Sequence, residues 1–308
     1  MLCVAAIVLQ RELAHLSFTE IAQGIGQIPA GEMAAAIALA VLSFIIGGLY
    51  EAAALRAVGY PLGLARPLVV YTVANSIGHC LGWSVITGGA LRWRLYQREG
   101  LTARAIAGVA ALSAVPFFLG AWLLLALAAI GAAAVISSRL HVDPIVVRGG
   151  AIAALSSLGV LLALLSRRGS ITIGRLRISS PGRTLLTVQV VAGVVELMIV
   201  ASMLYVLLGE QGQVTYTQFL VSYVAAVLLG QISSVPAGIG VLEASLLVFL
   251  PQVAPTALIA AVASYRAIYE GLPLVIGLSI LAGEEIRWRY RAGNADRTTA
   301  RPAAVPRP

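Results

Sequence analysis

The chain lacks several of the residues on which catalytic and metal sites are built. Its 308 residues include no lysine, two cysteines, Cys3 and Cys80, and three histidines, His15, His79 and His141. The cysteines have no CxxC spacing and the histidines no HExxH spacing, which argues against a disulfide framework and against a metal site. No GxxxxGK[ST] sequence occurs, so a P-loop for nucleotide is excluded. We therefore expect no metal ion, no cofactor and no catalytic residue.

Charge is also scarce. Charged residues make up 11% of the chain and hydrophobic residues 59%, a composition that excludes an ordinary soluble domain and is typical of a polytopic membrane protein. The 21 basic residues are all arginine, and they exceed the 13 acidic ones to give a formal net charge of +8. In a membrane protein the excess basic residues usually lie in cytoplasmic loops, where they face the anionic headgroups of the cytoplasmic leaflet. We therefore do not expect nucleic acid as a partner.

Eight apolar runs follow one another along the chain. Residues 1–10 have neither the basic leader nor the cleavage site of a signal peptide, and they read as the second half of a helix whose beginning is missing or misassigned. The other runs are 33–55, 67–86, 105–136, 144–166, 184–208, 219–250 and 256–282. The sequence therefore predicts an all-α, polytopic transmembrane helical bundle.

Two further segments have their own patterns. Residues 170–178 alternate with period two, which predicts a short β-hairpin in a cytoplasmic loop. The end of the chain is rich in arginine, alanine and proline, as in disordered segments. We predict an integral membrane domain over residues 1–286 and a basic, disordered cytoplasmic tail over residues 287–308.

The arginine-rich segments orient the second half of the chain. Residues 167–183 and the tail carry many arginines, and the positive-inside bias places both in the cytoplasm. Residues 209–216 and 251–255 carry almost no charge, which fits the outside. The run 219–250 must then start and finish outside. It is also too long for one crossing of about 20 residues and too short for two with a loop.

The same reasoning applies to the first half. Arginines mark residues 56–66 and residues 92–104 as cytoplasmic, so the segment 67–91 must start and finish inside. We therefore predict two re-entrant hairpins, each made of a broken helix, that open to opposite faces of the membrane.

Each predicted hairpin contains a break of small residues followed by a charge, Arg92 in the first and Glu243 in the second. Corresponding breaks in two halves of opposite orientation are typical of an inverted repeat with a binding site near the midplane, as in secondary transporters. The alternative is a chance similarity between two glycine-containing segments. The predicted hinge residues are Gly88, Gly89, Pro236, Gly238 and Gly240.

Placing an ionisable residue inside an apolar run costs free energy, so the residue needs a partner, a cavity or an interfacial position. They are Glu51, Arg92, Glu196, Glu243, Arg266 and Glu270. We predict that all of these except Glu51, together with Asn75 on the first hairpin, contact a bound ligand. His79, near Asn75, is either a further contact or a structural histidine.

Each candidate also has a structural interpretation. Glu243 is placed to cap the half-helix that follows the break, where the helix dipole favours a negative charge. Arg92 is placed to extend to lipid phosphates from a helix end. Arg266 and Glu270 have the i,i+4 spacing of an internal ion pair, although a guanidinium there also suits a lipid phosphate. Glu196 has no local partner and fits a hydrogen-bonded structural carboxyl equally well.

Three ordered motifs resemble the membrane domain of the bacterial lysylphosphatidylglycerol synthetase/flippase family, also called multiple peptide resistance factor. They are TGGALRWRLY at 87–96 followed by GLT at 100–102, VPAGIGVLE at 235–243 and YRAIYEGLP at 265–273. With the loop at 171–178, the similarity spans nearly the whole chain. The chain departs from the family pattern at Ala237, where a second glycine is usual, and in its shorter first helix.

The resemblance implies a protein of the bacterial cytoplasmic (inner) membrane that moves aminoacylated phosphatidylglycerol to the outer leaflet, which repels cationic antimicrobial peptides. Glu243, with Glu270, would receive the ammonium group, and Arg266 and Arg92 the phosphate. Full-length members continue into a soluble transferase domain, which the sequence up to Pro308 does not contain. We therefore expect a transporter and not an enzyme, with a phospholipid substrate, a separate synthase as a partner and a homo-oligomer as a further assembly. The alternatives are the membrane part of a phosphatidylglycerol lysyltransferase system and a non-transporting membrane scaffold.

Overall fold

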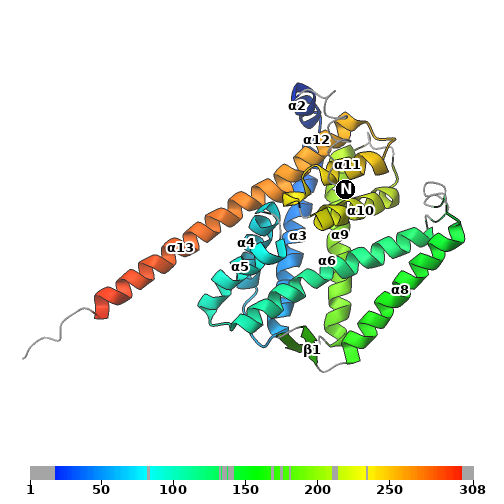
Figure 1. The fold of residues 1–308 in the computed structure, drawn as a ribbon. Helices are drawn as coiled ribbons and strands as arrows, with labels where there is room; N and C mark the ends of the chain where they lie inside the picture. Colours follow the sequence, from blue (N-terminus) through cyan, green and yellow to red (C-terminus); the bar gives the residue numbers. More distant parts are fainter. Residues whose placement is uncertain are drawn as a thin grey trace, which may run out of the picture.

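A computed structural model describes residues 18–81, 84–131, 133, 137, 142–167, 170–173, 176–179, 182–209, 214–233 and 235–299. Within this part of the chain, six helices are long and apolar enough to cross a membrane, and they pack into a bundle (Figure 1). The predicted fold class, an all-α polytopic helical bundle, is confirmed. Five of these helices are α3 (Ala30–Ala57), α6 (Ala103–Gly131), α8 (Pro144–Arg167), α9 (Arg183–Leu208) and α10 (Tyr216–Ser233).

The sixth is one continuous helix with an irregular turn in its middle. It consists of α12 (Pro255–Arg266), the π-helical turn η4 (Ala267–Gly271) and α13 (Leu272–Thr299). A shorter helix, α2 (Phe18–Gly26), lies against α12 at the end of the bundle opposite the β-hairpin (Figure 1). That hairpin is formed by β1 (Ser170–Ile173) and β2 (Leu176–Ser179), which pair antiparallel as their alternating pattern predicts.

The first hairpin consists of α4 (Ala65–Leu81) and α5 (Ser84–Tyr96), which continues into the short turn η1 (Gln97–Glu99). Its two arms touch through small residues, since a Cβ added to Gly78 would lie 3.0 Å from the backbone nitrogen of Gly88. Gly88 and Gly89 were predicted as the hinge, but they lie inside α5. The change of direction falls between α4 and α5. Gly88 instead allows the two arms to approach closely, whereas a Cβ on Gly89 would meet open space.

The second hairpin consists of α10, the short turn η3 (Pro236–Gly238) and α11 (Val241–Phe249). Its break lies at the predicted position. The backbone has positive φ at Ala237 (51°), Gly238 (60°) and Gly240 (82°), so it leaves the right-handed helical region there. Pro236 starts η3 and cannot donate a backbone hydrogen bond, which favours ending the preceding helix.

Charged residues at one end of the bundle join the segments predicted to be cytoplasmic. Arg66 at the start of α4 pairs with Glu99 at 2.7 Å and with Glu284 of α13 at 3.0 Å. Arg98 pairs with Glu285 at 2.7 Å. At the other end, a cavity of about 610 Å³ is lined by residues next to the segments predicted to be external, including Gln23, Glu32, Gly209 and Thr256. The two sets of loops therefore lie at opposite ends of the bundle.

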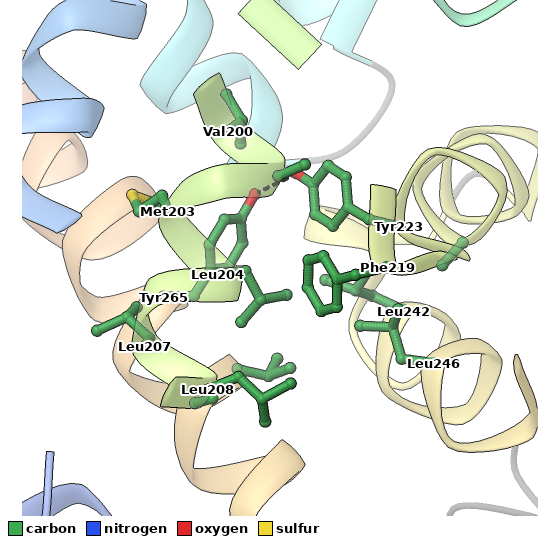
Figure 2. Close-up of a cluster of buried hydrophobic side chains, with 14 of the residues drawn as sticks. Val200, Met203, Leu204, Leu207, Leu208, Phe219, Tyr223, Leu242, Leu246 and Tyr265 are labelled. Atoms are coloured by element: carbon green, nitrogen blue, oxygen red, sulfur yellow. Dashed lines mark hydrogen bonds between the residues drawn. The ribbon is translucent and has the colours of Figure 1, made fainter. Parts of the chain in front are cut away.

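Two apolar clusters form the core. One joins side chains of α9, α10, α11 and α12, and Figure 2 shows Phe219 and Tyr223 of α10 packed between Leu204 of α9 and Leu242 of α11. The other joins α3, α4, α5 and α6 around Leu55, Val70 and Tyr96. The first cluster also includes residues of α3 and α6, and α13 packs against the second, so both clusters join the two halves of the chain.

Helices α6 and α9 approach so closely that their contact depends on glycine. A Cβ on Gly193 would clash with the carbonyl oxygen of Pro116 in α6. Pro116 has no N–H, so the carbonyl of Leu112, four residues earlier, loses its helical donor. The buried side chain of Gln189 on α9 replaces that donor, since its Nε2 lies 3.1 Å from the Leu112 oxygen.

The end of the chain differs from the predicted disordered tail. Residues 287–299 continue α13 as helix. Between Pro273 and Pro302 the sequence contains no proline, and Glu284 and Glu285 fix the preceding turns to Arg66 and Arg98. Residues 300–308 lie outside the described residues, and the domain boundary at residue 286 stays a prediction.

Candidate functional site at the broken helix

The two hairpins meet beside the middle of the helix formed by α12 and α13. The first hairpin's α4 contacts the break η3 of the second. Helix α12 has 12 residues and ends at Arg266. At about 1.5 Å per residue, Arg266 lies about 17 Å along the axis from Pro255, close to half of a hydrocarbon layer about 30 Å thick. The meeting point of the hairpins is therefore near the membrane midplane.

Arg266 is the centre of the polar contacts at this point. Its Nε donates to Oε1 of Glu243 at 2.7 Å, and its Nη1 donates to the carboxylate of Glu270 at 3.0 and 3.1 Å. Nη1 also donates to the carbonyl of Ala237 at 2.9 Å. Nη2 makes one long contact, 3.5 Å, with the carbonyl of Gly238. A single guanidinium thus ties the broken backbone to both carboxylates and keeps donor capacity on Nη2.

Glu243 makes the capping contact that its position in the sequence suggested, and it also pairs with Arg266. Its Oε2 accepts a hydrogen bond from the backbone N–H of Gly240 at 2.8 Å, which caps the start of α11. Its Oε1 accepts from Arg266. The same carboxylate therefore holds the half-helix in place and contributes a charge to the site.

Glu270 joins the two hairpins. Besides its bonds to Arg266, its Oε1 lies 3.8 Å from Nε2 of His79, near the end of α4. Asn75 is half-buried one turn earlier on the same helix, so the i,i+4 spacing places it on the same face as His79. The side chains of Arg266, Glu243 and Glu270 are only 10–16% exposed.

The π-helical turn explains how the end of α12 becomes irregular. The N–H of Leu272 donates to the carbonyl of Ala267, five residues earlier, and the next residue, Pro273, has no N–H to restore the usual pattern. Turns of this kind are frequent at functional sites. Here the turn contains Glu270, and sequence periodicity alone could not reveal it.

Arg92 lies in a different cluster. Its Nε and Nη2 form a fork on the carboxylate of Glu51 in α3, with contacts of 2.9 and 2.8 Å. Tyr96 and Ser113 donate to the same carboxylate at 3.1 and 2.7 Å. Glu51 is fully buried and Arg92 is 8% exposed. In this conformation Arg92 is engaged by protein groups, and it does not join Arg266.

Glu196 lies in a third cluster, surrounded by hydroxyl groups. Tyr50 of α3 lies 2.6 Å from Oε2, and Tyr71 of α4 lies 3.1 Å from Oε1. Ser43 lies 3.5 Å from Oε1 and 3.3 Å from the hydroxyl of Tyr269 in η4.

Of the six predicted contact residues, the structure brings together Glu243, Arg266 and Glu270, places Asn75 near them, and separates Arg92 and Glu196.

Sequence reasoning missed the tyrosines and the partner of Arg92. Tyr50, Tyr71, Tyr223, Tyr265 and Tyr269 all lie in apolar helices, and their hydroxyls needed partners there. The need of these hydroxyls for hydrogen-bond partners could therefore have identified the tyrosines from the sequence. Figure 2 shows one such pair, in which the hydroxyls of Tyr223 and Tyr265 lie 2.9 Å apart. The sequence shows that Glu51 needs a partner because an ionisable group in an apolar run costs free energy. Nothing in its spacing pointed to Arg92, 41 residues later.

Comparison with known proteins places the chain among bacterial membrane proteins. No family model matches it. It is 27% identical to inner membrane protein YbhN of Escherichia coli (strain K12) over 248 residues, which cover 79% of this chain and 77% of YbhN. It is 26% identical to the uncharacterised protein slr0712 of Synechocystis over 265 residues, 85% of this chain and 82% of that protein. The similarity to YbhN and the six apolar helices identify a multi-pass protein of the inner membrane.

Proposed function

We propose that this protein is a phospholipid translocase and that its headgroup site is the cluster of Arg266, Glu243 and Glu270. The observation that carries the proposal is the position of these charges. They lie near the midplane, beside a broken helix and at the contact between two hairpins that open to opposite ends of the bundle. Irregular backbone at this depth occurs only where protein groups or water in a cavity can form hydrogen bonds with its N–H and C=O groups. In transporters such breaks mark binding sites.

The charge of the cluster favours a lipid that carries ammonium groups. Two carboxylates against one guanidinium leave one negative charge in excess while His79 is neutral. Lysylphosphatidylglycerol, with one phosphate and two ammonium groups, has one positive charge in excess and complements it. Glu243 and Glu270 would accept the ammonium groups, and the Nη2 of Arg266 would donate to the phosphate.

This proposal assigns Arg92 to positioning. Its guanidinium is held in a fork by Glu51, so it anchors α5 to α3 and fixes the first hairpin against the bundle. Asn75 and His79 are then the residues through which that hairpin meets the headgroup, because they lie on the arm that reaches Glu270. Glu196 lies beside this site, beyond Tyr269 and Ser43.

In the cell we propose movement of aminoacylated phosphatidylglycerol to the outer leaflet, which lowers the negative surface charge and protects against cationic antimicrobial peptides. The protein would act as a transporter and not as an enzyme, and it would depend on a separate synthase for the lipid. The resemblance of its three motifs to the lysylphosphatidylglycerol synthetase/flippase family supports this substrate. A homo-oligomer is compatible with the proposal, which does not require one.

A cell assay tests the proposal. In cells that express a lysylphosphatidylglycerol synthase domain, an impermeant amine-reactive label measures the lipid in the outer leaflet with and without this protein. We expect labelling to rise with the protein and to return to background with Glu243→Gln, because glutamine can still accept the Gly240 N–H but offers no charge. Glu99→Gln, which alters an ion pair at the end of the bundle predicted to be cytoplasmic, is the matched control and should keep the rise. If the protein is a non-transporting scaffold, Glu243→Gln should give the same labelling as the wild-type protein.

A further inference from the structure

The side chains of Glu196, Tyr50 and Tyr71 come from three helices and form a closed triangle of oxygen–oxygen contacts. The contacts are 2.6 Å from Glu196 Oε2 to the hydroxyl of Tyr50, 2.9 Å between the hydroxyls of Tyr50 and Tyr71, and 3.1 Å from Tyr71 to Glu196 Oε1. Glu196 is 9% exposed, and the two tyrosines are 4–6% exposed. The first two distances are within the usual range of O–H···O hydrogen bonds, and the third is slightly longer.

No positive charge pairs with Glu196 in the part of the chain that the structure describes. Among the residues that the structure describes, the carboxylates of Glu51, Glu243 and Glu270 each pair with an arginine, whereas Glu196 meets only hydroxyl groups. An ionised carboxylate in a bilayer without a cation is expensive, and protonation is the simplest way to remove that cost.

The number of hydrogen atoms available to the three contacts also favours a protonated Glu196. Three oxygen–oxygen contacts require three hydrogens, and the two tyrosine hydroxyls supply two. If Glu196 is ionised, both tyrosines donate to it, and the contact of 2.9 Å between Tyr50 and Tyr71 has no hydrogen. If Glu196 carries a proton, it donates to Tyr50, Tyr50 donates to Tyr71, and Tyr71 donates to Oε1. Only the protonated form closes the ring.

We propose that Glu196 is a reversible proton-binding site and that its proton closes a ring of hydrogen bonds between α3, α4 and α9. Release gives a carboxylate and transfers the proton to water, with no change of oxidation state. The Tyr50–Tyr71 contact then loses its hydrogen, and α3 and α4 are no longer joined there. The ring is therefore a connection between helices that the proton makes and breaks.

Two links connect this site to the headgroup site. Tyr71 lies on α4, whose last turns carry His79 to Glu270, and its ring packs directly on Gly47 of α3, where any Cβ would clash with it. In the other direction, Ser43 bridges Glu196 and Tyr269, the residue before Glu270. The inference rests here on the proposed function: if the protein translocates lipid, the proton would couple that movement to a pH gradient.

The other titratable groups around Glu196 come from several helices. Helix α6 meets α9 at Gly193 through Pro116 and Gly120, which do not titrate, and the charged residues of α8, Arg148 and Arg167, lie toward its two ends. From the remaining elements the facing or neighbouring groups are Tyr50 and Glu51 of α3, Tyr71 of α4, Arg92 of α5, Tyr223 of α10, Tyr265 and Arg266 of α12, and Tyr269 and Glu270 of η4. Glu51 is paired with Arg92, whereas Glu270 shares Arg266 with Glu243.

Infrared difference spectroscopy of the full-length protein in lipid bilayers tests the proton site directly. We expect a carboxylic-acid C=O band that disappears as the pH is raised, that is absent in Glu196→Gln and that persists in Glu32→Gln, a carboxyl variant at the far cavity. Identical spectra of the wild type and Glu196→Gln at every pH would overturn the proposal. Loss of the band on adding Na⁺ at constant pH would also overturn it, because the site would then bind a metal cation.

Two tyrosine variants keep the carboxyl and protect the test against misfolding of Glu196→Gln. Tyr50→Phe and Tyr71→Phe each remove one hydroxyl, and with it two of the three hydrogen bonds of the ring, so each should move the midpoint of the band by at least about one pH unit. An unchanged midpoint in both variants would contradict the ring.

A second measurement separates this inference from the proposed function. In vesicles with a pH gradient, lysylphosphatidylglycerol should cross the membrane at a rate that depends on the gradient in the wild type but not in Glu196→Gln. Lipid movement with the same gradient dependence in both proteins would refute coupling through Glu196 and leave the lipid function standing. A titrating band without any lipid movement would support the proton site and refute the lipid function.

Discussion

The pair formed by Glu51 and Arg92 offers the most quantitative prediction. Both side chains are buried, and the guanidinium contacts the carboxylate through a fork at 2.8–2.9 Å. Removing one member of such a pair leaves the other charge buried and uncompensated, which costs about 3–5 kcal/mol. We therefore expect Arg92→Met to lower the free energy of unfolding by about that amount, because Tyr96 and Ser113 alone would hold the remaining carboxylate.

The double variant Glu51→Gln with Arg92→Met removes both charges. The hydroxyls of Tyr96 and Ser113 can donate to or accept from the new amide, so no polar group loses its partner. We expect the double variant to stay within about 2 kcal/mol of the wild type, which gives a favourable coupling energy of at least about 2 kcal/mol between the two substitutions.

The assay is reversible unfolding by SDS in mixed micelles. Arg94→Met is the control on the same helix, since the Arg94 side chain is 51% exposed and pairs with Glu285 near the bundle surface. Its cost should stay below about 1 kcal/mol. A cost for Arg92→Met no larger than that of the control, or a double variant whose cost equals the sum of the singles, would refute the structural role of the pair.

Three other changes test the fold around the site by the same unfolding measurement. Ala237→Gly should stabilise the protein by about 1 kcal/mol, because an alanine with φ of 51° is strained and glycine is not; a loss of stability would contradict this. Gly193→Ala should prevent close packing of α6 on α9 and sharply reduce the folded yield, whereas Gly89→Ala, with open space at its Cβ, should be tolerated. Gln189→Leu should cost about 1–3 kcal/mol, because the buried carbonyl of Leu112 would lose its donor, and a neutral effect would argue against that bond.

Much of the topology follows from the sequence because it depends on quantities that act along the chain. Apolar length and arginine distribution predicted the hairpins at 67–91 and 219–250, and the ion pairs of Arg66 and Arg98 with α13 join the segments expected on one side. The break at Pro236 also has a local cause, since proline and glycine determine backbone conformation where they occur.

The contacts of the site could be predicted only in part. The Arg266–Glu270 pair is local, at i,i+4, and its spacing is visible in the sequence. Glu51–Arg92 and Glu196–Tyr50 join residues far apart in the chain, and only the packing of three helices decides them. Gly88 and Gly89 show the opposite error, because a glycine pair that looks like a hinge lies inside α5, where Gly88 instead serves close helix packing.

The most direct test of the central claim uses the purified protein in vesicles that contain lysylphosphatidylglycerol in both leaflets. An impermeant amine reagent labels only the outer pool unless the lipid crosses. The account predicts that the wild-type protein also exposes the inner pool to the reagent, and that Glu243→Gln and Arg266→Gln do not when equally folded and reconstituted. Labelling confined to the outer pool with the folded wild-type protein, with or without a pH gradient, would contradict the claim that this protein moves the lipid.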